Sequence, residues 1–191
     1  MRGFAFGWAT HFFILGVFLV NKKKTCCFLG HRKITETDNM KLKLYEILER
    51  LITDENAGTF LFGSKSEFDT LCLKTVSKLK EKYPQIIRVY VRAEYPYITA
   101  EYENYLLQFY EITYFPDNAI NAGRAVYVER NYEMINKSDI CIFYYNKLYS
   151  PSQKTKNKEN LLDFQKKSGT GIAYMYAERK DKKIINMFNI I

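Results

Sequence analysis

The stretch "TCCFLGHRK", residues 25–33, indicates how the fold begins. Four residues suited to a buried strand run straight into Gly30 and then into two basic side chains, His31 and Arg32. Apolar residues then recur at helical spacing over 40–51, which is typical of a helix packed on a sheet. A strand that ends on a glycine and is followed by a helix is therefore the first unit we predict.

Composition favours one globular domain. The chain has 191 residues, of which 47% are hydrophobic and 16% aromatic, enough for one good core and short for two domains. The formal charge of +8 fits phosphate-bearing ligands, nucleic acid or an anionic membrane face, and equally a basic soluble surface. The four cysteines show no paired CxxC spacing, which predicts reduced thiols in a cytosolic protein and neither disulfides nor zinc ligands.

Residues 1–20 differ from the rest of the chain. Positions 4–20 are nearly all apolar, and lysines occupy positions 22–24. Three interpretations are open: a signal peptide, which lacks a suitable cleavage site; an anchor that would leave the domain facing the cytoplasm; and a misassigned start, with translation beginning near residue 20. The third is favoured, because the first strand begins within about five residues of that point. A single domain is expected over 21–191, cytoplasmic unless the segment is a real anchor.

Strands and helices are expected to alternate along the whole domain. Helical apolar spacing is found at 40–51, 68–79, 102–109, 125–135 and 171–178. Apolar runs that indicate strands lie between and beside them, at 25–30, 59–63, 86–91, 111–115, 139–145 and 183–188. This alternation predicts an α/β, Rossmann-like three-layer fold with a mostly parallel central sheet and helices on both faces.

The ends of the first two strands are candidate ligand contacts. In an open parallel sheet, ligands bind at the carboxyl edge. Gly30, His31 and Arg32 follow the first strand, and Gly63 and Ser64 follow the second. A glycine lets the backbone approach a ligand, and an arginine can bind a phosphate or carboxylate with two hydrogen bonds. The alternative is an ordinary turn with solvated basic residues.

A second candidate is the loop Ser168, Gly169, Thr170 and Gly171, which opens a helix. Backbone N–H groups and the helix dipole favour an anion there. The alternative is a plain helix cap by Ser168 or Thr170. Neither GxGxxG nor GxxxxGK[ST] occurs, which disfavours a dinucleotide-binding Rossmann enzyme or a P-loop nucleoside triphosphatase.

Arg130 and Asn131 form a third candidate. They lie on the helix predicted before the buried strand at 139–145, where they could turn toward the same cleft. The alternative is a charged, exposed helix face.

Four separated blocks together resemble a known family. They are "CCFLGHR", "FGSKSEFDTLCLKTVSKLKEKYP", "ERNYEMINKSDICIFYY" and "DFQKKSGTGIAYMYA". Their order and spacing, over residues 25–188, resemble the YpsA-like family of unknown function in the SLOG superfamily, which also contains the LOG phosphoribohydrolases and the DNA-processing protein DprA/Smf. The resemblance implies a nucleotide-derived ligand held by Gly30, by Gly63 and Ser64, and by the loop 169–171.

The resemblance to LOG enzymes is incomplete. Their catalytic arginine corresponds to Arg130, but their glutamate corresponds to Ala173. Glycosidic cleavage would then need Glu67, Asp69 or Glu129 as a replacement carboxylate. For Asp69 we expect a helix cap first, ribose binding second and catalysis third.

Binding or sensing of a nucleotide-derived small molecule is therefore the expected function. The first alternative is N-glycosidic hydrolysis of nucleoside monophosphates, and the second is single-stranded DNA binding through lysines and tyrosines. No metal or cofactor is expected. A membrane contact is expected only if residues 1–20 are an anchor, and a homo-oligomer is compatible with the sequence.

Overall fold

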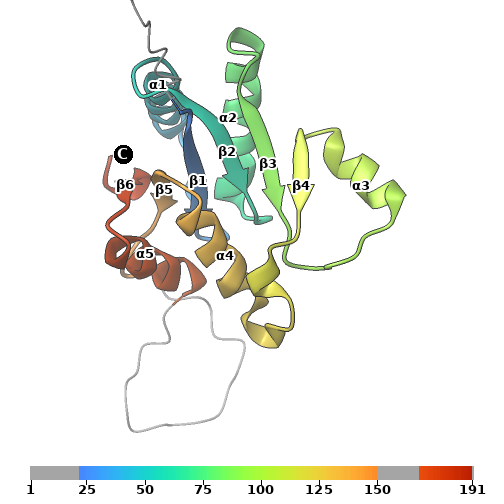
Figure 1. Ribbon diagram of the computed structural model, residues 1–191. Coiled ribbons are helices and arrows are strands. Elements are labelled where there is room, and N and C mark those ends of the chain that lie inside the picture. Colours follow the sequence, from blue (N-terminus) through green and yellow to red (C-terminus); the bar gives the residue numbers. More distant parts are fainter. Residues whose placement is uncertain (1–21, 150–167, 191) are drawn as a thin grey trace, which may run out of the picture.

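A computed structural model describes residues 22–149 and 168–190 and confirms the predicted fold class (Figure 1). Within them the chain forms one six-stranded sheet in which every neighbouring pair is parallel. The strands are β1 (Lys24–Gly30), β2 (Ala57–Phe62), β3 (Ile87–Val91), β4 (Ile112–Tyr114), β5 (Ile140–Tyr144) and β6 (Lys183–Asn186). The predicted strands correspond to these six in order.

The helices cover both faces of the sheet. They are α1 (Asp38–Thr53), α2 (Glu67–Lys82), α3 (Ala100–Leu107), α4 (Val126–Asn136) and α5 (Gly169–Arg179), with short 3-10 turns at Asp117–Ala119, Gly123–Ala125 and Met187–Asn189. Figure 1 shows α4 and α5 on the face opposite α1 and α2, while α3 stands beside the edge strand β4. The chain is thus a Rossmann-like, three-layer α/β protein.

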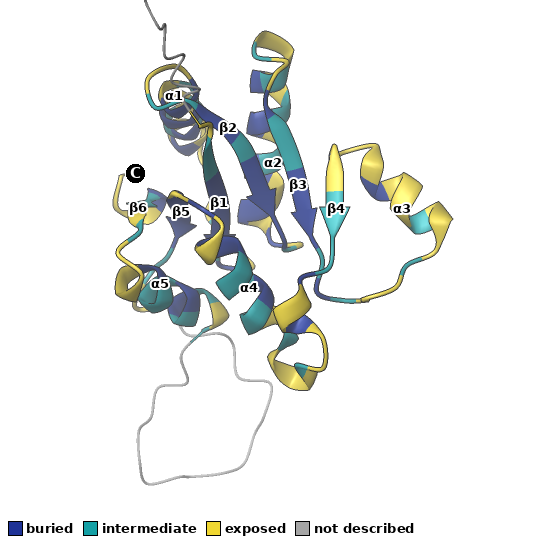
Figure 2. Cartoon of the chain, in the orientation of Figure 1, coloured by how far each residue is buried: buried dark blue, intermediate teal, exposed yellow. Residues whose placement is uncertain are grey.

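Alternating side chains of the strands build two cores. Cys26 and Phe28 of β1 pack with α1 and α2, whereas Cys27 and Leu29 pack with α4 and α5. Because β1 is central and buried on both faces, it reads as a continuous apolar run. Figure 2 shows the dark, buried residues concentrated in the central strands, while α3 is largely exposed and β4 ranges from exposed to half-buried. The four cysteines are free and buried.

Serine and threonine caps start four of the helices. The side chains of Thr37, Ser66, Thr99 and Ser168 accept hydrogen bonds from the third backbone N–H of α1, α2, α3 and α5. Such a cap satisfies a donor that has no partner inside the helix. Ser168 thus fulfils the helix-cap alternative predicted for its loop.

The last strand ends earlier than predicted. The strand expected over 183–188 ends at Asn186, because the Asn186 side chain accepts from Phe188 N at 3.3 Å and starts a 3-10 turn. The predictions for residues 1–20 lie outside the described residues. In the part of the chain that is described, no helix is long and apolar enough to cross a membrane.

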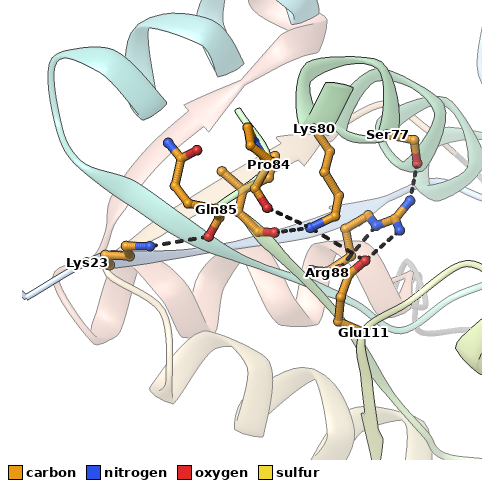
Figure 3. Close-up of polar contacts among 8 residues, drawn as sticks. Lys23, Ser77, Lys80, Pro84, Gln85, Arg88 and Glu111 are labelled. Carbon is orange, nitrogen blue, oxygen red and sulfur yellow. Dashed lines mark hydrogen bonds and ion pairs between the residues drawn. The ribbon is translucent and has the colours of Figure 1, made fainter. Parts of the chain in front are cut away.

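A polar network fastens α2 to the amino ends of β3 and β4 (Figure 3). The Arg88 guanidinium donates to Glu111 at 2.6 Å and to Ser77 Oγ at 2.7 Å, and the Arg88 backbone N–H donates to Glu111 Oε2 at 2.7 Å. Lys80 donates to the Pro84 carbonyl at 3.2 Å and lies 3.6 Å from Glu111. Glu111 therefore links the edge strand to β3 through charge-assisted bonds.

We expect Glu111→Gln to lower the free energy of unfolding by about 1–3 kcal/mol, the usual contribution of hydrogen bonds to charged groups. Burial raises the pKa of Glu111, but the bonds from Arg88 outweigh it and leave the pKa below its ordinary value. The stabilisation is present above the pKa that Glu111 has in the unfolded chain. It is lost as pH falls through the lower pKa that Glu111 has in the folded protein. Urea denaturation of the wild type and the variant at pH 7 and pH 3 measures this loss of stability.

Glu46→Gln, which breaks an exposed pair with Lys43, is the control and should change stability by less than about 0.5 kcal/mol. Equal effects of the two substitutions would contradict the prediction.

Candidate functional site

The predicted site residues gather at the carboxyl edge of the sheet. The strand order is β4-β3-β2-β1-β5-β6, so the direction of winding reverses between β1 and β5 (Figure 1). Ligands of open α/β sheets bind outside the carboxyl ends of the strands near such a reversal. Two groups of side chains lie at this edge, one over β2 and β3 and one over β1 and β5.

The first group forms because Gly63 has no side chain. A Cβ at Gly63 would lie 2.7 Å from both Arg130 Nη1 and Met134 Sδ. Arg130 therefore crosses the end of β2 from α4, and only 4% of it is exposed. The predicted turn at Gly63 has a steric reason, which is the close approach of this arginine.

Asp69 reaches the same place from the first turn of α2, on the other face of the sheet. Its Oδ2 accepts from Ser64 N at 3.2 Å, while its Oδ1 is buried and has no hydrogen-bond partner in the described part of the chain. Burial raises the pKa of Asp69 to about 7, although the charge of Arg130 and backbone hydrogen bonds oppose the rise. Ser66, not Asp69, caps α2, so the cap expected first for Asp69 is wrong.

Arg130 is a buried cation with few partners. Its Nε donates to Asn131 Oδ1 at 3.0 Å, and its Nη1 is 3.5 Å from the Val91 carbonyl. Among the described residues it forms no ion pair with Asp69 or any other carboxylate. Burial lowers its pKa, and the charge of Asp69 acts against that. Asn131 thus orients the guanidinium, and the remaining donors are available to an anionic or polar ligand.

Two further residues belong with this group and were missed in the sequence. The Tyr90 hydroxyl at the end of β3 is buried without a hydrogen-bond partner in the described chain. Burial raises the pKa of Tyr90, and the charge of Glu94 raises it further. The charge of Glu94 also acts on Arg130. Tyr90 and Glu94 both lie near the carboxyl end of β3. A position at a strand end is also the signal that identified Gly30 and Gly63 as candidates. We call Gly63, Ser64, Asp69, Tyr90 and Arg130 the Asp69–Arg130 cluster.

The second group begins at Gly30, whose neighbour is the first turn of α2. A Cβ there would lie 2.4 Å from Phe68 Cδ1 and 2.6 Å from Phe68 Cβ. The glycine therefore brings α2 close to β1. The Glu67 N–H donates to the Arg32 carbonyl at 3.0 Å and the Ile34 N–H donates to Glu67 Oε2 at 2.9 Å, which fastens the loop after β1 to the same helix end.

His31 and Arg32 have opposite environments. His31 is only 2% exposed, its ring stacks on Tyr149 with centroids 3.9 Å apart, and its Nε2 accepts from Asn146 N at 2.9 Å. Burial lowers the pKa of His31 and favours the neutral ring. The alternative in which His31 is solvated is wrong, because its side chain is buried against the Tyr149 ring. Arg32 is exposed, and in the described residues its side chain has no hydrogen bond or ion pair.

The start of α5 lies beside this group. Gly171 faces the Tyr145 ring, which a Cβ would approach to 3.3 Å, and Tyr145 lies 5.8 Å from His31 between ring centroids. Gly169 is exposed with open space around it, and Thr170 is half-buried. Phe68, which contacts both Gly30 and Tyr144, connects the second group to the Asp69–Arg130 cluster.

The other two candidate carboxylates accept hydrogen bonds from groups other than Arg130. Glu67 is exposed and accepts from the Ile34 backbone, and the Glu129 carboxylate is 3.2 Å from Asn118 Nδ2. Of the three candidate carboxylates, Asp69 is the one whose charge acts on Arg130. Residues 22–149 and 168–190 contain no group of three or more side chains arranged to hold a metal ion.

A cavity of about 380 Å³ opens next to the cluster, between the loop after β3, the segment after β4 and the start of α4. Its lining includes Glu94, Tyr97, Ile120 and Val126. Val126 and Arg130 are four residues apart on α4 and hence share one helix face. The cavity and the buried arginine are therefore neighbouring parts of one region.

No protein-family model matches the sequence, and no curated protein is significantly similar to it.

Proposed function

We propose that the protein binds a nucleotide or nucleotide-derived small molecule at the carboxyl edge of the sheet, as a YpsA-like member of the SLOG superfamily. The observation that carries the proposal is the Asp69–Arg130 cluster. It groups a buried arginine, which forms no ion pair among the described residues, with a carboxyl oxygen and a phenol that are buried without a hydrogen-bond partner there, and the charges of these groups interact. Unsatisfied buried polar groups are rare in native proteins and are satisfied by water or a ligand.

The ligand chemistry follows from the residues. Arg130 suits a phosphate or other anion, because its guanidinium donates two parallel hydrogen bonds. Asp69 and Tyr90 suit hydroxyl groups, such as those of a ribose, since a carboxylate accepts and a phenol both donates and accepts. The cavity volume of about 380 Å³ lies in the range of small-ligand sites. An anion, hydroxyls and a cavity beside them are what a nucleotide requires.

We expect Arg130→Gln to weaken nucleotide binding about 10- to 100-fold, because a charge-assisted hydrogen bond contributes about 1.5–3 kcal/mol. The test is calorimetric titration of the wild type and the variant with nucleoside monophosphates, with circular dichroism to confirm that the variant is folded. Arg179→Gln, in the last turn of α5, is the matched control and should bind like the wild type. An unchanged dissociation constant in folded Arg130→Gln would contradict the proposal, as would a wild type that binds no nucleotide.

Hydrolysis of the N-glycosidic bond is a second candidate function, favoured by one observation. A buried carboxyl with a pKa of about 7 beside an arginine is suited to general acid or base catalysis near neutral pH. Assay of the titrated samples for free base and ribose phosphate separates the two functions. Recovery of the intact nucleotide would show binding without hydrolysis.

A further inference from the structure

The cavity next to the Asp69–Arg130 cluster has a lining unlike that of a phosphate site. Glu94 is the charged residue among the described residues that line it, and none of these is a lysine or an arginine. One Glu94 oxygen is 3.4 Å from the Ala93 N–H, a weak contact that leaves the carboxylate free to accept from a ligand. A site with a carboxylate and no cation repels phosphate and attracts N–H donors.

Apart from Asn121, which is polar, the other side chains of the lining offer flat or apolar contacts. Tyr97 is 93% exposed and Ile120 is 52% exposed, although both line the cavity, and Pro96 and Phe115 add apolar surface. A tyrosine presented to solvent at the mouth of a cavity is a platform on which an aromatic ring can stack. Arg92 fixes the loop after β3, because its Nη1 donates hydrogen bonds to the Tyr95 carbonyl at 3.2 Å and to the Pro96 carbonyl at 3.4 Å.

Glu94 and Arg130 therefore present opposite chemistry to the two ends of one ligand. The charges of these two side chains interact, and Val126, which lines the cavity, shares a helix face with Arg130. A molecule with an anionic end at Arg130 and a flat, hydrogen-donating end at Glu94 fits both.

We propose that this cavity is the base subsite and that Glu94 selects guanine; the inference rests on the proposed nucleotide binding. Guanine presents two adjacent donors, N1–H and the 2-amino group, which match the two oxygens of a carboxylate. Hypoxanthine has only N1–H on this edge, adenine has only its 6-amino group, and uracil places carbonyl oxygens on both sides of its single N–H. The repulsion between these oxygens and Glu94 adds to the selectivity.

The test is calorimetric titration of the full chain with GMP, IMP, AMP and UMP. We expect GMP to bind most tightly, IMP and AMP about tenfold or more weakly, and UMP most weakly. In Glu94→Gln the preference for GMP over AMP should fall to about threefold or less, because an amide offers one acceptor and places donors against the guanine edge. Glu103→Gln, on exposed α3, is the control and should keep the wild-type order.

Tyr97→Ala separates stacking from base selection. We expect it to weaken all four nucleotides about tenfold while the ratio of GMP to AMP stays unchanged, since stacking tolerates any base. Equal binding of the four nucleotides, or a GMP preference that persists in Glu94→Gln, would overturn the guanine subsite and leave the proposed function standing. Failure of all four to bind would overturn both.

Discussion

Gly30→Ala is expected to lower the free energy of unfolding by about 3 kcal/mol and the melting temperature by roughly 6–12 °C. The new methyl group would lie 2.6 Å from Phe68 Cβ, an atom that cannot move unless the backbone of α2 moves. Phe68 is fully buried and packs on Tyr144, so its ring has no empty space to enter. The substitution therefore pushes the first turn of α2, and with it Asp69, away from the end of β1. Thermal and urea denaturation of the purified variant measure the loss.

Gly169→Ala provides the matched control. Gly169 is the first residue of α5, and a Cβ there would meet nothing within 4 Å. Replacing an unstrained helical glycine by alanine stabilises a protein by a few tenths to about 1 kcal/mol. The two Gly→Ala substitutions should thus have opposite signs. A Gly30→Ala variant as stable as the wild type would show that α2 does not pack against β1 as described.

The sequence was sufficient for the fold because local signals agreed with the tertiary arrangement. Each apolar run reads as a strand or one face of a helix, and the runs are bounded by recognisable signals, such as Tyr83 before Pro84 at the end of α2. Because strands alternate with helices of ordinary length along the chain, the expected arrangement is a parallel sheet covered by helices. The positions of Gly30 and Gly63 at strand ends were predicted for the same reason.

The contacts within the site could not be predicted in the same way. That Gly63 makes room for Arg130 depends on two segments far apart in the sequence. The burial of His31 depends on Tyr149, whose position follows from the pairing of β1 with β5. Tyr90 has the residue type of an ordinary strand former, and only its unpartnered hydroxyl beside a buried arginine distinguishes it.

The second large effect concerns Asp69 and the pH dependence of stability. Its pKa rises from 3.8 to about 7 on folding, a difference that corresponds to about 4 kcal/mol. Between these two values the folded state holds a proton that the unfolded state has lost. The contribution of Asp69 to stability is therefore fully present below about pH 4, decreases as pH rises to about 7, and is constant above that.

Asp69→Asn should remove this dependence, because an amide keeps an oxygen for the Ser64 N–H and does not ionise. We expect the variant to be more stable than the wild type by about 2–4 kcal/mol at pH 8 and nearly equal to it at pH 4. Urea denaturation of both proteins at several pH values measures the difference, in which the titration of His31 and of other shared groups cancels. A difference that does not change with pH would show that Asp69 ionises at its ordinary pKa.

The same substitution should weaken nucleotide binding, so stability and binding are expected to change in opposite directions. A carboxyl that serves only to stabilise the fold would be satisfied by its neighbours, and its removal would destabilise the protein. Asp69 instead remains buried, and among residues 22–149 and 168–190 one of its oxygens has no partner and it forms no ion pair, although its charge interacts with that of Arg130. Groups that cost stability are typical of ligand sites, where the ligand supplies the missing partners. An Asp69→Asn variant that gains stability at pH 8 and still binds nucleotide with wild-type affinity would remove Asp69 from the proposed site.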